Sequence, residues 1–122
     1  MSAQILIVDD SKTMRDMVNF TLTGAGYGVT EAKDGVEALG AIGTGQRFDV
    51  IITDLNMPNM DGFGLIERVR ANAQYRFTPI LMLTTESDPA KKDRGKALGA
   101  TGWIVKPFNP EKLVQVVQKV CM

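Results

Sequence analysis

The chain has 122 residues, a length that fits one compact domain, and its 44% apolar and 23% charged residues are ordinary for a globular protein. Its formal net charge is +0, which argues against a nucleic-acid-binding protein held by bulk electrostatics. No apolar run approaches the length of a membrane span, and the first residues lack a signal-peptide pattern. We therefore expect a cytoplasmic protein.

The chain contains no histidine, and its single cysteine is Cys121. An internal disulfide is therefore impossible, and catalysis by Ser-His-Asp or Cys-His groups is excluded, as is zinc bound by histidine. Any chemistry must use carboxylates, hydroxyls, lysine side chains and the backbone.

Short apolar runs alternate with amphipathic stretches along the chain. The runs at 5–8, 29–30, 50–52, 80–83 and 103–105 predict β-strands. Repeated strand–helix alternation predicts an α/β protein with a doubly wound (βα)5, flavodoxin-like fold around a five-stranded parallel sheet. We expect residues 1–122 to form a single domain.

Start and stop signals mark three of the helices that follow these strands. Asp34 and Glu37 have the spacing of a capping box, and Asp88 and Asn109 each precede a proline, a pattern typical of helix starts. Gly99 is placed to end the helix that begins after Asp88. The apolar positions that mark the first, third and last helices are Met14, Met17, Val18, Phe63, Ile66, Val69, Leu113, Val116, Val117 and Val120.

Polar side chains follow four of the predicted strands, each at the point where the strand ends. In chain order they are Asp9, Asp10, Asp54, Thr84, Thr85 and Lys106. Because ligands of such sheets bind beyond the C-terminal ends of the strands, we expect these side chains to line one pocket. Any one of them alone could equally be a helix cap or a turn residue, but four signals in one order are hard to explain in that way.

The three carboxylates of this set favour a bound cation. Clustered carboxylates repel one another unless a cation neutralises them, and oxygen ligands favour a hard cation. Mg²⁺ fits best, because it accepts a few carboxylates and keeps several waters, which leaves room for a phosphate oxygen. Lys106 would pair with a transferred phosphoryl group, and a threonine hydroxyl would hydrogen-bond a second phosphoryl oxygen.

Three sequence blocks resemble the receiver domains of two-component response regulators. They are residues 8–11 (VDDS), 54–62 (DLNMPNMDG) and 106–108 (KPF), which match in order and spacing, and the resemblance extends from 5 to 120. It implies that Asp54 is the phosphoacceptor. It also implies that Asp10, Asp54 and the backbone carbonyl of Asn56 bind Mg²⁺ directly, with Asp9 acting mainly through water.

The resemblance assigns further roles around this site. Lys106 would contact the phosphoryl group, and its peptide bond to Pro107 would be cis. Thr84 and Trp103 would be the hydroxyl and aromatic switch positions. Asn56 and Glu86 resemble the pair that tunes dephosphorylation in the chemotaxis subgroup.

Two residues depart from the family pattern. Thr85 stands where alanine or another small residue is usual, which bears on access to the phosphoryl group. Trp103 stands where tyrosine or phenylalanine is usual, which bears on the inward flip expected of a smaller ring.

The function expected from the resemblance is a signalling switch without an output domain of its own. A histidine kinase of the chemotaxis type would supply the phosphoryl group. The chain, as a monomer, would then contact a protein target such as a flagellar motor switch component, through the face of the last two helices and the last strand. A phosphate sink or a phosphorelay remains an alternative. We expect only self-phosphorylation and self-dephosphorylation, and neither nucleic-acid nor membrane binding.

Two rival functions use the same fold. A phosphohydrolase with Asp54 as nucleophile usually has a second acid two residues later and a substrate-binding cap, but Asn56 stands at that position and 122 residues leave no room for a cap. A flavodoxin-like electron carrier would suit the topology, but carboxylates at the strand ends oppose a flavin phosphate.

Overall fold

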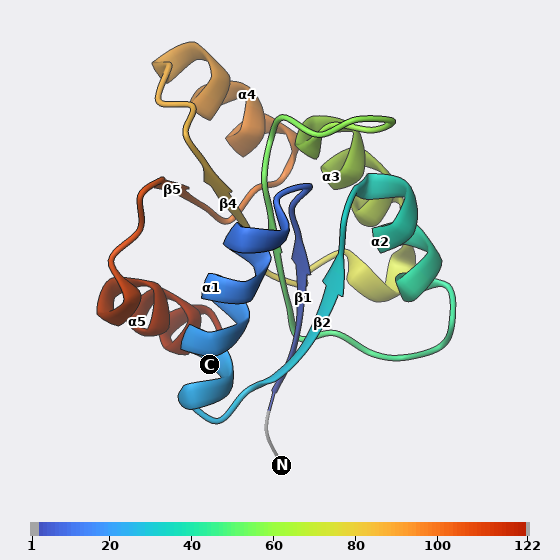
Figure 1. Cartoon of the computed structure of the whole chain (residues 1–122). Helices are drawn as coiled ribbons and strands as arrows, with labels where there is room; N and C mark the ends of the chain where they lie inside the picture. The colour runs from blue at the N-terminus through green and yellow to red at the C-terminus, as the bar shows by residue number, and fades with distance from the viewer. Residues whose placement is uncertain (1–2, 122) are drawn as a thin grey trace.

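A five-stranded parallel sheet forms the centre of the structure, a computed structural model that describes residues 3–121 (Figure 1). The strands are β1 (Gln4–Val8), β2 (Gly28–Ala32), β3 (Val50–Thr53), β4 (Ile80–Thr84) and β5 (Gly102–Val105), in the spatial order β2-β1-β3-β4-β5. The predicted fold is confirmed. β2 is longer than the predicted 29–30, because all its residues pair in register with Gln4–Val8 of β1 although Gly28 and Glu31 are not apolar.

Five α-helices and one short 3-10 helix connect the strands. The α-helices are α1 (Lys12–Gly24), α2 (Gly35–Ile42), α3 (Gly62–Ala71), α4 (Pro89–Leu98) and α5 (Pro110–Val120), and the 3-10 helix is η1 (Ala73–Tyr75). The predicted caps are confirmed, since Asp34, Asp88 and Asn109 each accept a backbone N–H of the helix they start. Gly99 ends α4 in the left-handed conformation, with a φ of 115°.

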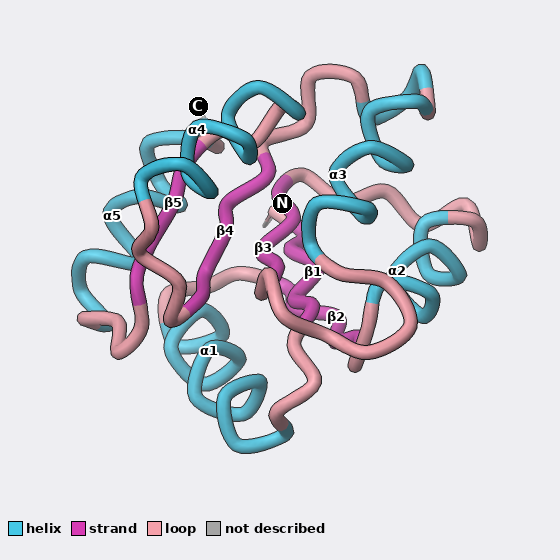
Figure 2. The backbone as a smooth tube through the Cα atoms, turned by 90° about the horizontal axis from the view of Figure 1, so that it is seen from above, coloured by secondary structure: helices cyan, strands magenta, loops and turns pink. Residues whose placement is uncertain are grey.

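The helices cover both faces of the sheet, as Figure 2 shows. Alternate residues of the central strands point to opposite faces, so the sheet carries two apolar clusters. One contains Ile5, Ile7, Val18, Leu22 and Leu113, and it lies under α1 and α5. The other contains Leu6, Ile51, Phe63, Ile66 and Met82, and it lies under α2 and α3, with α4 beside α3.

The strand order fixes where a ligand site can form. The chain passes from β1 to the edge strand β2 and then returns to β3 on the other side of β1. Because the crossovers leave β1 in opposite directions, a crevice opens between the C-terminal ends of β1 and β3. Residues that follow these two strands therefore meet at the switch point of the sheet.

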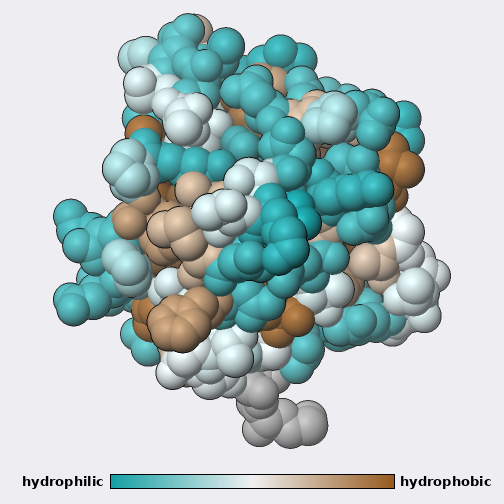
Figure 3. All heavy atoms as spheres, in the orientation of Figure 1, coloured by the Kyte–Doolittle hydropathy of each residue, from teal (hydrophilic) through white to brown (hydrophobic). Residues whose placement is uncertain are grey.

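The face of the molecule shown in Figure 3 is mainly hydrophilic, but apolar side chains gather on it over α1 and α5. Phe20 of α1 is 84% exposed, and Met17, one of the residues that predicted this helix, is half-exposed. A groove of about 550 Å³ next to Phe20 is lined by residues of α1 and α5, including Val114. Among residues 3–121, no helix is both long and apolar enough to span a bilayer.

Candidate functional site

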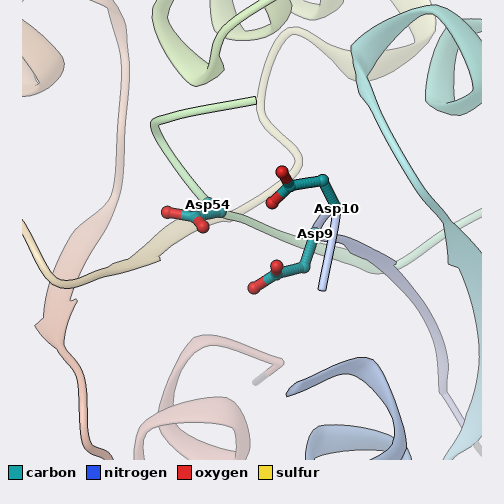
Figure 4. A group of neighbouring side chains, drawn as sticks. All are labelled: Asp9, Asp10 and Asp54. Carbon is teal, nitrogen blue, oxygen red and sulfur yellow. The ribbon is translucent and has the colours of Figure 1, made fainter. Parts of the chain in front are cut away.

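The carboxylates of Asp9, Asp10 and Asp54 meet at the switch point of the sheet. Asp9 and Asp10 follow β1, and Asp54 follows the neighbouring strand β3. Each offers one oxygen, and these oxygens all lie within 4.8 Å of one another. Figure 4 shows the three side chains at the two strand ends, with the carboxyl groups of Asp9 and Asp10 on the side that faces Asp54.

The two acids after β1 differ in their surroundings. Asp9 is 3% exposed, and its Oδ1 accepts the backbone N–H of Ser11 at 2.9 Å. Arg15 of α1 donates Nη1–H to the backbone oxygen of Asp9 at 2.6 Å, which ties the β1–α1 turn to the helix. Asp10 is exposed, and within the part of the chain that the structure describes no hydrogen bond or ion pair involves its carboxylate. Asp10 is therefore the acid of the cluster that is open to solvent.

Asp54 is held by the backbone that follows it. Its Oδ1 accepts the N–H of Leu55 at 2.7 Å, and its side chain is 12% exposed. The N–H of Gly62, at the start of α3, donates to the carbonyl of Leu55 at 2.8 Å. A Cβ on Gly62 would lie 2.5 Å from the carbonyl oxygen of Asp54, so a residue without a side chain lets α3 begin this close to the end of β3.

Lys106 bridges the two buried acids. Its Nζ lies 2.7 Å from Oδ2 of Asp9 and 3.1 Å from Oδ2 of Asp54, and its side chain is 9% exposed. Burial by itself lowers the pKa of the Lys106 ammonium, but the hydrogen bonds and charges of Asp9 and Asp54 outweigh it, and the pKa is raised. The peptide bond between Lys106 and Pro107 is cis, as the resemblance implies.

The charges of this cluster do not balance. Three carboxylates and one ammonium leave a formal charge of −2 at one strand edge. All the side-chain donors are oxygens apart from the ammonium, and such a set suits a hard divalent cation. The residues present therefore fit Mg²⁺.

A second group of residues lies around the loop between β4 and α4. Thr84 is fully buried, and its Oγ1 accepts the backbone N–H of Glu86 at 3.3 Å. The indole N–H of Trp103 donates to the backbone oxygen of Glu86 at 2.8 Å. The Glu86 carboxylate pairs with Lys91 at 3.1 Å, and this bond, with the N–H of Asp88, lowers the pKa of Glu86. Thr84 and Trp103 thus hold the backbone of the same residue.

Three residues singled out in the sequence have side chains that make no hydrogen bond to the carboxylates among the described residues. The indole ring of Trp103 packs against Gly95 of α4, where a Cβ would lie 2.9 Å from the ring. Asn56 and Thr85 have exposed side chains at the rim. Within residues 3–121, none of these three side chains makes a hydrogen bond to the three carboxylates of the cluster.

Two sets of side-chain hydrogen bonds near the site were not predicted from the sequence. Arg15 bonds Glu31 of β2 as well as the backbone of Asp9, and Asp34 bonds Asn59 in the β3–α3 loop. The capping pattern gave the first role of Asp34, but no pattern links it to a residue 25 positions away.

Comparison with known proteins agrees with this geometry. The family model described as the response regulator receiver domain matches residues 5–118. The chemotaxis protein CheY homolog of Campylobacter jejuni is 42% identical over 118 residues, which cover 96% of this chain and 91% of that protein.

Solved structures extend the comparison to three dimensions. Chemotaxis protein CheY4 of Vibrio cholerae is 57% identical, with a TM-score of 0.94, over 98% of this chain and 99% of that one. The receiver domain of a sensor histidine kinase from Pseudomonas aeruginosa, solved with a magnesium ion coordinated in its active-site cleft, is 27% identical. Its TM-score is 0.90, over 99% of this chain and 98% of that one.

CheY-like receiver domains work with histidine kinases and downstream targets in phosphorylation-activated signalling. The match to residues 5–118 includes β2, β3, β4 and β5, all of β1 except Gln4, α1 to α4, most of α5, and the strand ends that carry the acidic cluster. This chain belongs to the family of response regulator receiver domains and is of the chemotaxis, CheY-like, type.

Proposed function

We propose that Asp54 accepts a phosphoryl group from a histidine kinase in the presence of Mg²⁺, and that the phosphorylated chain signals by binding a protein target. One observation carries the proposal. Asp54 directly follows β3 with its carboxylate oriented by Leu55 and Lys106, beside two further carboxylates within 4.8 Å. A receiver domain needs this combination of a nucleophile, a metal site and a cation.

The proposed Mg²⁺ ligands are the carboxylates of Asp10 and Asp54 and the backbone carbonyl of Asn56, with Asp9 acting through water. The oxygen donor set and the formal charge of −2 support this assignment. The magnesium ion in the Pseudomonas aeruginosa receiver domain supports it by analogy. Bound Mg²⁺ supplies positive charge that offsets the negative charge of the carboxylates and of the phosphoryl oxygens.

The phosphoryl transfer uses residues that already surround Asp54. One oxygen of the Asp54 carboxylate attacks phosphorus, and a new P–O bond forms as the P–N bond to the kinase histidine breaks. The leaving imidazole nitrogen keeps the electron pair of that bond and takes up a proton. Lys106, at 3.1 Å from Asp54, then pairs with a phosphoryl oxygen. Thr84 accepts a hydrogen bond from Glu86, so its own proton is available to a second phosphoryl oxygen.

Hydrolysis of the phosphorylated Asp54 returns the chain to its inactive state. We assign Asn56 and Glu86 to positions that set its rate, since Asn56 lies exposed two residues after Asp54 and Glu86 stands at the β4–α4 loop. The oxygen of a water molecule forms a new bond to phosphorus as the P–O bond to Asp54 breaks, so that Asp54 leaves as the carboxylate, inorganic phosphate is released and the proton of the water passes to phosphate or solvent. The chemistry then consists of self-phosphorylation and self-dephosphorylation, with no separate substrate turned over.

The partners follow from the family and the site. We propose a chemotaxis-type histidine kinase as donor and a flagellar motor switch component as target, with a phosphate sink or relay as the alternative. The proposed output face consists of α4, β5 and α5, because Trp103 of β5 and the Glu86 loop connect it to the strand ends. We propose that the chain acts in the cytoplasm as a monomer.

Labelling with a small phosphodonor tests the phosphoacceptor. With Mg²⁺ and acetyl phosphate, the intact mass of the wild-type chain should rise by one phosphoryl group, and Asp54→Asn should abolish the rise. Asp93→Asn, which removes an exposed acid on α4, should label like the wild type. Stoichiometric labelling of Asp54→Asn at another residue would overturn the assignment.

A further inference from the structure

The loop from 55 to 61 joins β3 to α3 and carries Asn56, whose carbonyl we assign to the metal site. Its two ends are fixed close to Asp54. Leu55 donates its N–H to the Asp54 carboxylate, and Gly62 donates its N–H to the carbonyl of Leu55. Within the loop, the N–H of Met60 donates to the carbonyl of Pro58 at 2.7 Å, which forms a tight turn. The outer part of the loop needs a separate anchor.

Asn59 supplies that anchor. Its φ is 69°, and it is the one non-glycine residue with positive φ in the described part of the chain. Asparagine tolerates this left-handed conformation better than most residues, but the conformation still needs support from outside the loop. The side-chain amide of Asn59 donates to Oδ2 of Asp34 at 2.9 Å.

Asp34 links this loop to another element. The residue is 5% exposed, and its Oδ1 accepts the N–H of Glu37 at 2.8 Å as the N-cap of α2. The Glu37 N–H, and next the Asn59 amide, lower the pKa of the Asp34 carboxyl, so both oxygens accept hydrogen bonds as an anion. A helix cap needs only one of these oxygens. The other is directed to the loop.

The neighbouring residues fit the same contact. A Cβ on Gly35 would lie 3.0 Å from Cβ, Cγ and Sδ of Met60, so the start of α2 and the loop meet without room for a side chain at Gly35. The Met60 side chain packs against the apolar cluster below α2 and α3. Asn59 and Met60 therefore fasten the loop to the start of α2 by one polar and one apolar contact.

We propose that Asp34 and Asn59 are positioning residues of the metal site, which hold the loop in the conformation that presents the Asn56 carbonyl. Neither touches the metal, and the inference rests on the Mg²⁺ assignment made under the proposed function. When the link is lost, the loop samples other conformations, and metal binding must select the competent one. The apparent Mg²⁺ affinity then equals the intrinsic affinity multiplied by the fraction of molecules whose loop is in the binding conformation.

An exchange of the two side chains tests this role. Asn59→Asp places two carboxylates against each other and breaks the link, whereas Asp34→Asn with Asn59→Asp restores one amide and one carboxylate at the same pair of positions. Mg²⁺ affinity is measured on the full chain by calorimetric titration without a phosphodonor. We expect Asn59→Asp to weaken it by about tenfold, and the double variant to return it to within about threefold of wild type.

The direction of the change in Mg²⁺ affinity distinguishes the loss of loop position from the effect of the added charge. Asn59→Asp adds a negative charge near a cation site, which by electrostatics alone would strengthen Mg²⁺ binding. A weaker Mg²⁺ affinity of Asn59→Asp would therefore show that the loop no longer holds its position. Asp88→Asn is the matched control, because Asp88 also caps a helix but makes no hydrogen bond to the loop among the described residues, and it should leave the affinity unchanged. Thermal unfolding in EDTA checks that each variant folds.

Two results would overturn the inference, and they differ. If the wild type binds Mg²⁺ while Asn59→Asp binds it as tightly or more tightly, the positioning role is wrong and the proposed function stands. Failure of the double variant to recover affinity would also remove the role of the pair. If the wild-type chain itself binds no Mg²⁺, the metal assignment of the proposed function is wrong, and the positioning role falls with it.

Discussion

Asp10 contributes the carboxylate of the cluster that Lys106 does not bind. Lys106 pairs with Asp9 and Asp54, whereas Asp10 faces solvent within 4.8 Å of both acids. Without metal its charge repels theirs, so Asp10→Asn should raise the free energy of unfolding by about 1 kcal/mol at low ionic strength. Urea unfolding in EDTA measures this change.

Addition of Mg²⁺ should reverse the order of stability. The wild type should gain stability from the bound ion, and Asp10→Asn should gain little if Asp10 is a direct ligand, as proposed. Asp93→Asn, at an exposed acid outside the cluster, should follow the wild type in both buffers. An Asp10→Asn variant with the wild-type Mg²⁺ titration would show that Asp10 is not a ligand.

Asp34 gives the chain a stability term that depends on pH. Its folded-state pKa lies below the ordinary value because of the hydrogen bonds from Glu37 and Asn59. A lowered folded pKa stabilises the protein above the unfolded pKa, about pH 4, and this contribution is lost as the pH falls through the folded pKa. The difference in free energy of unfolding between wild type and Asp34→Asn should therefore be largest near pH 7 and should shrink below about pH 4.

Urea unfolding of both proteins at a series of pH values from 7 to about 2.5 measures this difference. Asp93→Asn, which removes an exposed carboxylate elsewhere on the surface, is measured in parallel as the control for the loss of one acid. If the difference in free energy of unfolding between wild type and Asp34→Asn stays constant with pH, the charge of the Asp34 carboxylate does not contribute to its hydrogen bonds with Glu37 and Asn59.

At the scale of elements, Arg70 joins the end of α3 to two other segments. Its Nη1 donates to the carbonyls of Tyr75 and Thr78 at 2.8 and 2.6 Å, and Nη2 donates to that of Gly99 at 2.7 Å. Burial lowers the pKa of Arg70, yet the guanidinium stays charged and has enough donors for all three carbonyls.

Lysine has one nitrogen and cannot reproduce this planar set of donors. Arg70→Lys should therefore lower the free energy of unfolding by about 2 kcal/mol, measured by urea unfolding. Arg68→Lys, at an exposed arginine in the same last turn of α3, should change it by less than about 0.5 kcal/mol. Equal unfolding midpoints for the two variants would contradict a structural role for Arg70.

The sequence predicted those elements whose signals are local. The buried runs of β1, β3 and β4 and the caps at Asp34, Asp88 and Asn109 are patterns within a few residues, and the structure confirms them. The acidic cluster could also be anticipated, because parallel topology brings the ends of β1 and β3 together. The order of motifs was therefore enough to indicate where a metal could bind.

Contacts with a backbone atom or with a distant residue left no such signal. Trp103 bonds a carbonyl 17 residues away, and every residue type offers that acceptor. Asn59 reaches Asp34 from a backbone with positive φ, which the sequence does not specify for asparagine. Arg70 is one of two basic residues in the last turn of α3, and only packing separates it from Arg68.

At the scale of the whole molecule, a chain of contacts leads from the strand ends to the side of the sheet covered by α4. Thr84 at the end of β4 holds the N–H of Glu86, and Trp103 of β5 holds its carbonyl. The Trp103 ring packs on α4 at Gly95, and the Glu86 carboxylate pairs with Lys91 of the same helix. A change at Thr84 therefore reaches α4 through the peptide groups of one residue.

Trp103 is the single tryptophan and reports on this connection. If Thr84 turns toward a phosphoryl group, its Oγ1 leaves the N–H of Glu86, the loop shifts, and the carbonyl bound to the indole moves with it. Such coupling requires two discrete packings of the loop, which a ligand at Asp54 can bias.

Beryllofluoride with Mg²⁺ should therefore change the emission wavelength of Trp103 or its quenching by acrylamide, and Mg²⁺ alone should do so less. Thr84→Ala should blunt the change, whereas Thr85→Ala, at the exposed neighbour, should preserve it. Identical emission and quenching in every state would show that the indole stays fixed against α4 and that activation reaches the surface through another element.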